Sequence, residues 1–390
     1  MESNRVVVLI VVLVIAAIVT IYLLTKPRDG RASPPRSTRS PAPGVSASLR
    51  ISPSVVPIVP PALTISSRAQ PVELSTFSFF GSDCLPVEQR EALMGNLRKL
   101  PRPPLSLYKL VSPEYLDSAS SSQISDLITS EALIAAQVLA RVNSPFYGLR
   151  KPVVSIGQAV TFLGLNSVRS ICLQYMLEES FKSGSPERKR VFDMVFGASA
   201  LGGELCFRLA QRLELPAQGS LVTQLVLSFL GHLATAALMP LDKLLWSPDN
   251  GLLERASAEQ LCLGLSATEI GSLLMREWGL PAGLIAEVGD IDKVLVRPSG
   301  QIEPKREARV DLCFLCARLG ERLALGSLSD FAAFDLGTDS SVEFFHLLGH
   351  LDLPGMARLA DSLRSTELHK SVQQMQRAIQ AGPQASIPGS

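Results

Sequence analysis

The sequence has no excess of either charge and none of the short motifs that mark common nucleotide-binding or hydrolytic sites. Its 37 lysines and arginines nearly balance its 36 aspartates and glutamates, which gives a net charge of +1 over 390 residues. Nucleic-acid binding depends on clustered basic residues, so nucleic acid is not expected as a partner. The sequence also lacks a glycine-rich phosphate loop, a Gly-x-Ser-x-Gly elbow and a dinucleotide-binding fingerprint. No catalytic motif is therefore recognisable.

Cysteine is scarce, and its spacing is not that of a disulfide framework. Most of the six cysteines are scattered along apolar stretches, which is typical of a reducing compartment. Cys313 and Cys316 form a Cys-x-x-Cys pair, but they lie in a predicted amphipathic helix over residues 309–325 and no second pair accompanies them. We interpret them as two small buried side chains on one helical turn, with a zinc or redox pair as the alternative.

One long hydrophobic run stands near the N-terminus. Residues 6–24 are apolar except for Thr20 and Tyr22, and as a helix they would extend roughly 28 Å, close to the thickness of a bilayer core. A cleavable signal peptide would have a shorter apolar region, a more basic front and a small-residue cleavage site. The sequence therefore predicts a single transmembrane anchor over residues 1–26.

Basic residues on the two sides of this run predict its orientation. Arg5 alone precedes the run, and Glu2 offsets its charge. The basic residues that follow it are Lys26, Arg28, Arg31, Arg36 and Arg39. Positive flanks stay in the cytoplasm, so the long part of the chain is expected there.

The chain after the anchor divides into a linker and a helical domain. Residues 27–84 are rich in proline, serine and arginine, which predicts a disordered, semi-extended tether. Within it, residues 55–61 are apolar and proline-rich; we interpret them as stiff linker, with a docking motif for a partner as the alternative. From residue 85 onward apolar residues recur with helical spacing, and no alternation typical of strands is found.

The fold class predicted for residues 85–370 is all-α. We divide this domain into an N-terminal helical part, residues 85–185, and a second part, residues 186–370. A helix end and a disordered tail over residues 371–390 are expected to follow. Apolar positions from Ile124 to Leu139 predict one helix. Further helices are expected over residues 190–213, 221–239, 268–278, 281–288, 309–325, 342–348 and 354–379.

Four short stretches of this domain occur in an order that is typical of one family. Residues 141–148 read Arg-Val-Asn-Ser-Pro-Phe-Tyr-Gly, residues 100–104 read Leu-Pro-Arg-Pro-Pro, and residues 278–281 read Trp-Gly-Leu-Pro. Residues 155–164 carry Ser-Ile-x-Gln-Ala-Val-x-x-Leu-Gly. Together they resemble the HDOD family, the HD-related output domains of bacterial signalling proteins, over roughly residues 90–370. The residues singled out in these stretches are Asn143, Ser144, Phe146, Tyr147, Gly148, Gln158, Gly164, Trp278 and Pro281.

The Asn-Ser stretch also has a structural interpretation. Asn143 and Ser144 would close a long helix and offer side-chain oxygens to free backbone N–H groups. Phe146 and Tyr147 would fix the following turn on the core. A ligand-recognition loop is the alternative.

The resemblance implies a fold related to the HD phosphohydrolases, which hold metal ions with histidines and aspartates on adjacent helices. A cation needs several imidazole or carboxylate donors that converge on one point. Here the positions that would carry these ligands are Ala198, Gly231, His232, Ala267, Gly289, Asp290 and Arg318. Only His232 and Asp290 could donate to a metal, so we expect no metal, no other cofactor and no catalytic residue. His232 is interpreted as a buried histidine, with a metal or ligand contact as the alternative.

Two other histidines have a spacing that suits a chelate. His346 and His350 are four residues apart, and Glu343 is nearby as a third donor. We interpret this segment as a solvated helix face, with a zinc site as the alternative.

Three functions are compatible with these observations. We expect the first, a non-catalytic signalling domain that is tethered to the bacterial inner membrane and binds a protein partner. The second is a divergent metal-dependent phosphohydrolase acting on a nucleotide or cyclic dinucleotide. The third is a receptor without turnover, which binds a nucleotide in the cleft that corresponds to the metal site of the HD phosphohydrolases.

The orientation of the anchor can be tested with a reporter. An enzyme that is active only in the periplasm, fused after Ser390, is expected to be silent, because the basic flank keeps the body in the cytoplasm. The same reporter fused in front of Met1 serves as the control and should be active. An active fusion after Ser390 would contradict the predicted topology.

Overall fold

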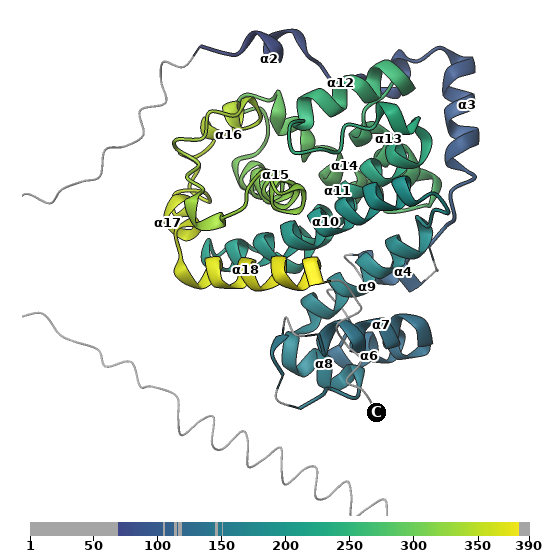
Figure 1. Ribbon diagram of the computed structural model, residues 1–390, viewed down its shortest axis with the longest axis vertical. Helices are drawn as coiled ribbons and strands as arrows, with labels where there is room; N and C mark the ends of the chain where they lie inside the picture. The colour runs from purple at the N-terminus through teal and green to yellow at the C-terminus, as the bar shows by residue number, and fades with distance from the viewer. Residues whose placement is uncertain are drawn as a thin grey trace, which may run out of the picture. The chain divides into compact units, whose positions relative to one another are not determined.

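The structure is a computed structural model that describes residues 69–103, 106–112, 115, 119–144, 147–149 and 151–381. Within these residues every regular element is a helix (Figure 1). The expected all-α class is therefore confirmed. The predicted anchor and most of the predicted linker lie outside the described residues, as do residues 382–390 of the tail.

Three long helices form the centre of the body. They are α10 (Pro186–Arg212), α11 (Gln218–Leu238) and α15 (Pro304–Leu325), and α10 packs closely against both of the others (Figure 1). In the described part of the chain α11 is also the one helix long and apolar enough to cross a membrane, but 89% of its apolar window is buried in the body. It is therefore placed here as a core helix.

Local sequence explains where α10 and α15 begin and where α15 ends. The Ser185 side chain caps α10 by accepting from the Arg188 N–H, and Pro186 occupies its first turn. The Glu303 side chain caps α15 in the same way ahead of Pro304. Both starts combine a side-chain acceptor with a proline that is preset for a helix. Gly326 ends α15 with a φ of 80°, a backbone angle that favours glycine.

Shorter helices cover this centre. Helices α13 (Ala267–Glu277) and α14 (Ala282–Gly289) pack on α11, and α18 (Thr366–Ala381) packs on α10. The remaining elements on this side are α12 (Leu252–Leu263), α16 (Phe345–Leu348), α17 (Leu359–Leu363) and the short 3-10 turns η3 (Leu241–Lys243), η4 (Asp292–Leu295), η5 (Phe331–Ala333) and η6 (Val342–Phe344). Helix α12 was not predicted, and the helices expected over residues 342–348 and 354–379 are each divided in two.

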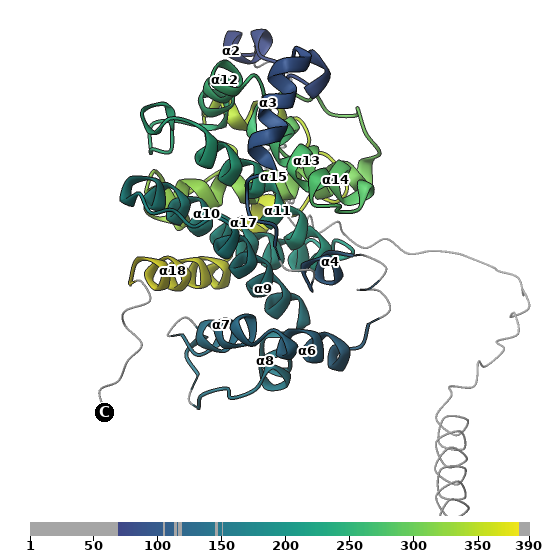
Figure 2. The ribbon, with the colours of Figure 1, turned by 90° about the vertical axis from the view of Figure 1, so that its right-hand side faces the viewer.

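A smaller lobe lies at one end of α9 (Leu165–Ser180). It consists of α6 (Ser121–Ser130), α7 (Ala132–Val142) and α8 (Ile156–Leu163), which pack on one another and on α9 (Figure 2). Helix α4 (Ser106–Val111) contacts both α6 and α9. We call α6, α7 and α8 the small lobe.

The prediction of one helix from Ile124 to Leu139 is wrong, because two helices meet at Glu131. That residue leaves helical geometry, with φ −103° and ψ 85°. Just before it, the Thr129 and Ser130 hydroxyls donate back to carbonyls of the preceding turn, which weakens a helix. Ile128 and Ile134 are both buried although six positions separate them, a spacing that a continuous helix does not place on one face.

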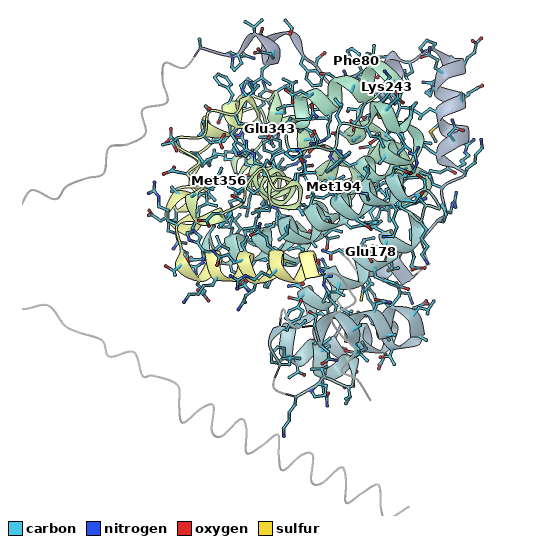
Figure 3. The ribbon with its side chains drawn as sticks, viewed as in Figure 1. Phe80, Glu178, Met194, Lys243, Glu343 and Met356 are labelled. Carbon is cyan, nitrogen blue, oxygen red and sulfur yellow. The ribbon has the colours of Figure 1, made fainter. Side chains whose placement is uncertain are left out.

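The predicted linker also ends earlier than expected. Helix α2 (Val72–Thr76) and the turn η1 (Ser82–Cys84) precede α3 (Val87–Leu97), and Leu74 is 2% exposed. Gln260 of α12 accepts from the Phe80 N–H at 3.1 Å and donates to the Ser78 carbonyl at 3.1 Å. Figure 3 shows Phe80 beside α12. The folded part thus includes residues 72–84, which bind to a helix about 180 positions away and have little helical pattern of their own.

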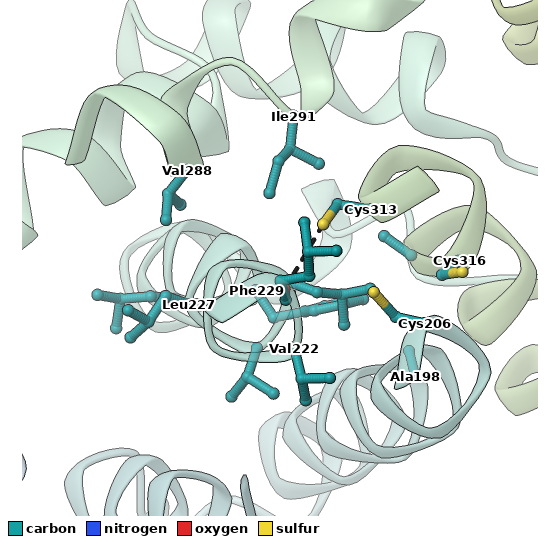
Figure 4. Packing of buried hydrophobic residues seen from close by; sticks show 14 of the residues in the cluster. Ala198, Cys206, Val222, Leu227, Phe229, Val288, Ile291, Cys313 and Cys316 are labelled. Carbon is teal, nitrogen blue, oxygen red and sulfur yellow. Dashed lines mark hydrogen bonds between the residues drawn. The ribbon is translucent and has the colours of Figure 1, made fainter. Parts of the chain in front are cut away.

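The Cys-x-x-Cys pair belongs to the packed core. Cys313 and Cys316 on α15 and Cys206 on α10 are fully buried among apolar side chains (Figure 4). Burial raises the pKa of the Cys316 thiol, so it stays protonated and unreactive. No group of donors among the described residues has the arrangement of a metal site. The interpretation as small core side chains therefore accounts for the pair.

Glycines let the central helices approach one another closely. A Cβ atom on Gly231 of α11 would lie 1.9 Å from the Ala267 carbonyl oxygen on α13. A Cβ on Gly320 of α15 would lie 2.4 Å from the Ala198 carbonyl oxygen on α10. Both neighbours are backbone atoms, which cannot rotate away. The two helix pairs therefore depend on the absence of a side chain at these positions.

Substitution of Gly231 tests this packing. Gly231→Ala is expected to lower the free energy of unfolding by about 1–3 kcal/mol or more, because α11 and α13 must separate to admit a methyl group. Gly95→Ala on α3 is the control, since nothing lies within 4 Å of its added Cβ. That variant should be neutral or stabilised by up to ~1 kcal/mol. Urea unfolding of both variants measures the difference, and equal stability would contradict the close contact.

Candidate functional site

His232 occupies the interior of the body, on the side of α11 that faces α12 and η4. Its side chain is 1% exposed. The ring Nε2 lies 3.6 Å from Asp292 Oδ2, and Nδ1 lies 3.9 Å from Glu259 Oε1. These distances are those of ion pairs rather than of hydrogen bonds. Burial alone would lower the pKa of His232, but the two carboxylates raise it above its ordinary value.

Arg318 of α15 lies beside the same carboxylate. Its guanidinium is 3.4 Å from Asp292 and 2.9 Å from Glu321, and its side chain is 1% exposed. Burial alone would raise the pKa of Asp292. Arg318, His232 and a 2.9 Å hydrogen bond from Thr268 hold that pKa well below its usual range. Asp292 is therefore a carboxylate that faces two cations.

Helix α12 completes the arrangement. Arg255 donates to Glu321, and its guanidinium lies 4.5 Å above the ring of Trp246. Glu259 accepts from the Ala267 N–H at 2.7 Å and from the Thr235 hydroxyl at 3.1 Å. Trp246 also packs edge to face against His232, with ring centroids 5.5 Å apart. Trp246 therefore covers both Arg255 and His232.

We call these six ionisable side chains the buried charge cluster. They are all buried, and they come from α11, α12, η4 and α15. With His232 protonated, three cations face three carboxylates, so the cluster is neutral as a whole. Its members are His232, Arg255, Glu259, Asp292, Arg318 and Glu321.

The Asn-Ser stretch is held by hydrogen bonds to its own neighbourhood. Asn143 Nδ2 donates to the carbonyls of Leu139 at 2.9 Å and Val153 at 2.8 Å, and Asn143 Oδ1 accepts from the Val153 N–H at 2.7 Å. The Tyr147 N–H donates to the Ser144 carbonyl at 3.1 Å, and Gly148 has a φ of 57°. Asn143 thus ties both ends of the loop together, which is a structural task. Phe146 lies outside the described residues.

Other residues of the family-like stretches also lie at turns. The Gln158 N–H donates to the Ser155 side chain at 3.2 Å, so Ser155 caps the start of α8. The Gln158 side chain accepts from the Val154 N–H at 2.9 Å, one residue before the position that a full capping box would use. Gly164, with a φ of 80°, joins α8 to α9. Trp278 is buried at the end of α13, and Pro281 precedes α14.

A small cavity with both polar and apolar walls lies beside this stretch. It has a volume of ≈ 40 Å³, and its walls include Arg141, Tyr147, Gln174 and Glu204. Burial raises the pKa of Tyr147 to about 12. The cavity has room for only a few water molecules and is far below the size of a nucleotide site.

Comparison with known proteins agrees with the motifs. Residues 100–292 match the model of the HDOD domain family. The chain contains an HDOD domain. The search of curated proteins finds no match.

Several solved structures are similar to this chain at low sequence identity. An HDOD domain protein of unknown function from Geobacter sulfurreducens is 18% identical with a TM-score of 0.50, and the match covers 74% of this chain and 97% of that one. A candidate phosphohydrolase from Shewanella amazonensis is 19% identical with a TM-score of 0.48, over 74% of this chain and 98% of that one. A candidate signal transduction protein from Marinobacter aquaeolei is 19% identical with a TM-score of 0.48, over 76% and 65%. At 18% identity the likeness to the Geobacter protein concerns the fold alone.

The positions that correspond to HD metal ligands do not converge in this HDOD domain. Ala198 and Gly231 lie where helices touch through backbone atoms. A Cβ atom added to Gly289 would lie 3.1 Å from the Ser272 hydroxyl. Asp290 is partly exposed and pairs with Arg306, with Lys293 at 3.8 Å and with Arg297 at 3.8 Å. Only His232 and Arg318 reach the buried charge cluster through their side chains, and Ala267 reaches it through its N–H.

A divalent cation does not fit the residues at this position. Asp292, Glu259 and Glu321 are the only carboxylates of the cluster, and each already faces the guanidinium of Arg318 or Arg255 or the ring of His232. A metal needs the same oxygens with no cation between them. The described residues thus hold protein cations where the resemblance would put a metal.

Sequence reasoning missed four members of the cluster. Asp292 follows the mapped Asp290 by two positions, and Arg255 and Glu259 lie on the unpredicted α12. Glu321 is three positions after Arg318 on α15. The available signal was a charged residue at a core-facing position of an otherwise apolar helix, which Arg318 itself shows between Leu315 and Leu319.

The second histidine pair does not form a chelate either. His350 Nδ1 lies 2.9 Å from Asp311, and Nε2 lies 3.2 Å from the Arg297 carbonyl. Glu343 of η6 instead accepts from the Leu252 N–H and lies 3.7 Å from Arg322. Figure 3 shows Glu343 near α16. His346 and His350 are both buried, so the interpretation as a solvated helix face is wrong. His350 and Glu343 thus bind different partners and do not converge on one point.

Removal of Arg318 tests the cluster. Arg318→Met is expected to lower the free energy of unfolding by about 3–5 kcal/mol, because Asp292 and Glu321 would stay buried without their partner. Arg358→Met is the matched control, since Arg358 is 58% exposed in a surface pair with Glu214. That change should cost no more than ~0.5 kcal/mol. Guanidinium unfolding measures the free energy of unfolding of both variants. An equal decrease in both would show that the buried ion pairs stabilise the fold no more than the surface pair does.

Proposed function

We propose that this HDOD protein is a non-catalytic signalling module that is tethered to the bacterial inner membrane and acts by binding a protein partner. The observation that carries the proposal is the buried charge cluster. It places Arg318 and His232 against Asp292, in the region where the HD relatives implied by the resemblance hold metal ions. A surface that binds a partner is then the remaining way for the domain to transmit a signal.

Hydrolysis of a phosphoester at an HD-type centre needs metal-bound water as the nucleophile. A catalytic metal must keep one coordination position open to water and substrate. The charge cluster offers neither, because its carboxylates are paired with protein cations and its side chains are buried. The same burial argues against a receptor that binds a nucleotide at the position of the HD metal site. Trp246 and the packed helices cover the side chains at that position.

The membrane tether rests on the sequence. The apolar run at residues 6–24 and the basic residues behind it are the features of an inner-membrane anchor with a cytoplasmic body. Residues 27–68 then supply a proline-rich spacer between the anchor and the first described helix. A tether of this kind keeps the domain near the membrane while leaving its surface free for a partner.

Metal content and turnover test the non-catalytic assignment. The purified protein is expected to carry no stoichiometric transition metal, and to leave nucleotides and cyclic dinucleotides intact when Mn, Mg or Fe is added. The reason is that no free set of donors is available at the cluster. His232→Ala is the diagnostic variant and His369→Ala, at a histidine outside the cluster, is the control. About one ion per chain together with turnover that only His232→Ala abolishes would establish the phosphohydrolase instead.

A further inference from the structure

A second hollow lies in the small lobe, away from the charge cluster. It is a groove of ≈ 590 Å³ between α6 and α8, with residues of α7 as its floor. Aliphatic side chains from α7 and α8 give it an apolar surface, and hydroxyl-bearing residues from α6 line its edge. Representative lining residues are Leu139, Val154, Ile156, Val160, Ser125 and Asp126.

The small lobe also carries large apolar side chains that are exposed rather than buried in the core. Leu133 on α7 is 71% exposed, Val154 before α8 is 70% exposed, and Phe162 on α8 is 56% exposed. Among the described residues these are three of the eight large exposed hydrophobic side chains, although the lobe is only a small part of the body. Of these three residues only Val154 lines the groove, so it adds one exposed side chain to the apolar surface of the groove.

Hydroxyl groups and the carboxylate of Asp126 form the polar edge of the groove. The hydroxyls of Ser125, Thr129 and Thr161 donate to backbone carbonyls of their own helices at 2.7 to 2.9 Å, so their lone pairs face outward. Asp126 is the one ionisable side chain among the lining residues, and no described residue forms an ion pair or hydrogen bond with it. The negative charge of Asp126 therefore favours a partner with Lys or Arg.

The walls also restrict the shape of the occupant. The walls are α6, α7 and α8 together with Val154 and Ser155 just before α8, and no strand lies among them, so an extended peptide would find no sheet edge to join. No lining residue is aromatic, whereas grooves that bind proline-rich peptides are lined by aromatic rings. An amphipathic helix remains, because its apolar residues can enter such a groove one turn apart.

We infer that the groove between α6 and α8 binds an amphipathic helix of a partner protein. Apolar residues spaced three or four apart would lie over Leu139 and Val160, and a Lys or Arg would pair with Asp126. This inference rests on the proposed function and names the chemistry of its partner.

A displayed library of random peptides of about 16 residues, which span roughly 24 Å as a helix, tests the inference on the full chain. The enriched peptides should combine helical apolar spacing with a basic residue. Their affinity should fall at least about tenfold for Val154→Ser and for Asp126→Lys. Replacing the basic residue of a selected peptide by Glu should restore its affinity for Asp126→Lys.

Matched surface variants serve as controls. Leu261→Ser changes an apolar side chain that is 91% exposed on α12, and Asp242→Lys changes a carboxylate that is 74% exposed on η3. Both should bind the selected peptides like the unaltered protein. Equal binding by all four variants, or enrichment of acidic or proline-rich peptides, would overturn the inference, as would no enrichment at all.

Two other occupants have their own outcomes. A dimer in light scattering that Val154→Ser disrupts would identify a second copy of the chain in the groove. A gain in peptide affinity of about tenfold on deletion of residues 55–61 would identify the linker of this chain instead. Either result would overturn the inference. None of these outcomes depends on the metal and turnover assays, so failure of the groove and failure of the non-catalytic assignment are separate results.

Discussion

The ion pairs of Arg318 with Asp292 and Glu321 are the contact on which the rest of the body depends. They join α15 to η4 in a region with almost no access to water. Arg255 shares Glu321, and His232 shares Asp292, so α12 and α11 are fixed by the same charges. A buried ion becomes costly as soon as its partner moves away. Four segments that are distant in sequence are therefore set in register by one balance of charge.

Sequence predicted the central helices well because their signals are local. The helices found at α10, α11 and α15 overlap the predicted ranges, and the additional turns at the starts of α10 and α15 carry Ser185, Glu303 and two prolines. The motif comparison also placed His232 and Arg318 on these helices. Burial and helical spacing at those positions follow from the apolar residues around them.

The parts that sequence did not predict depend on distant contacts. Leu74 is buried by a domain that begins after it, and Gln260 holds residues 78–80 from α12. Asp292 belongs to the cluster and Asp290 does not, because α14 ends at Gly289 and the chain turns before η4. A spacing of two residues decides which carboxylate points inward, and nothing in the local pattern shows where that turn falls.

The close approach at Gly231 also limits what a substitution at this position could achieve. Restoring a histidine there would not restore a metal ligand, since its Cβ would meet the Ala267 carbonyl before the imidazole could reach any ion. Helix α13 would first have to move, which in turn would disturb the hydrogen bond from the Ala267 N–H to Glu259. No single substitution at this position leads back toward a metal centre. The backbone contact between α11 and α13 thus restricts which side chains this position can hold.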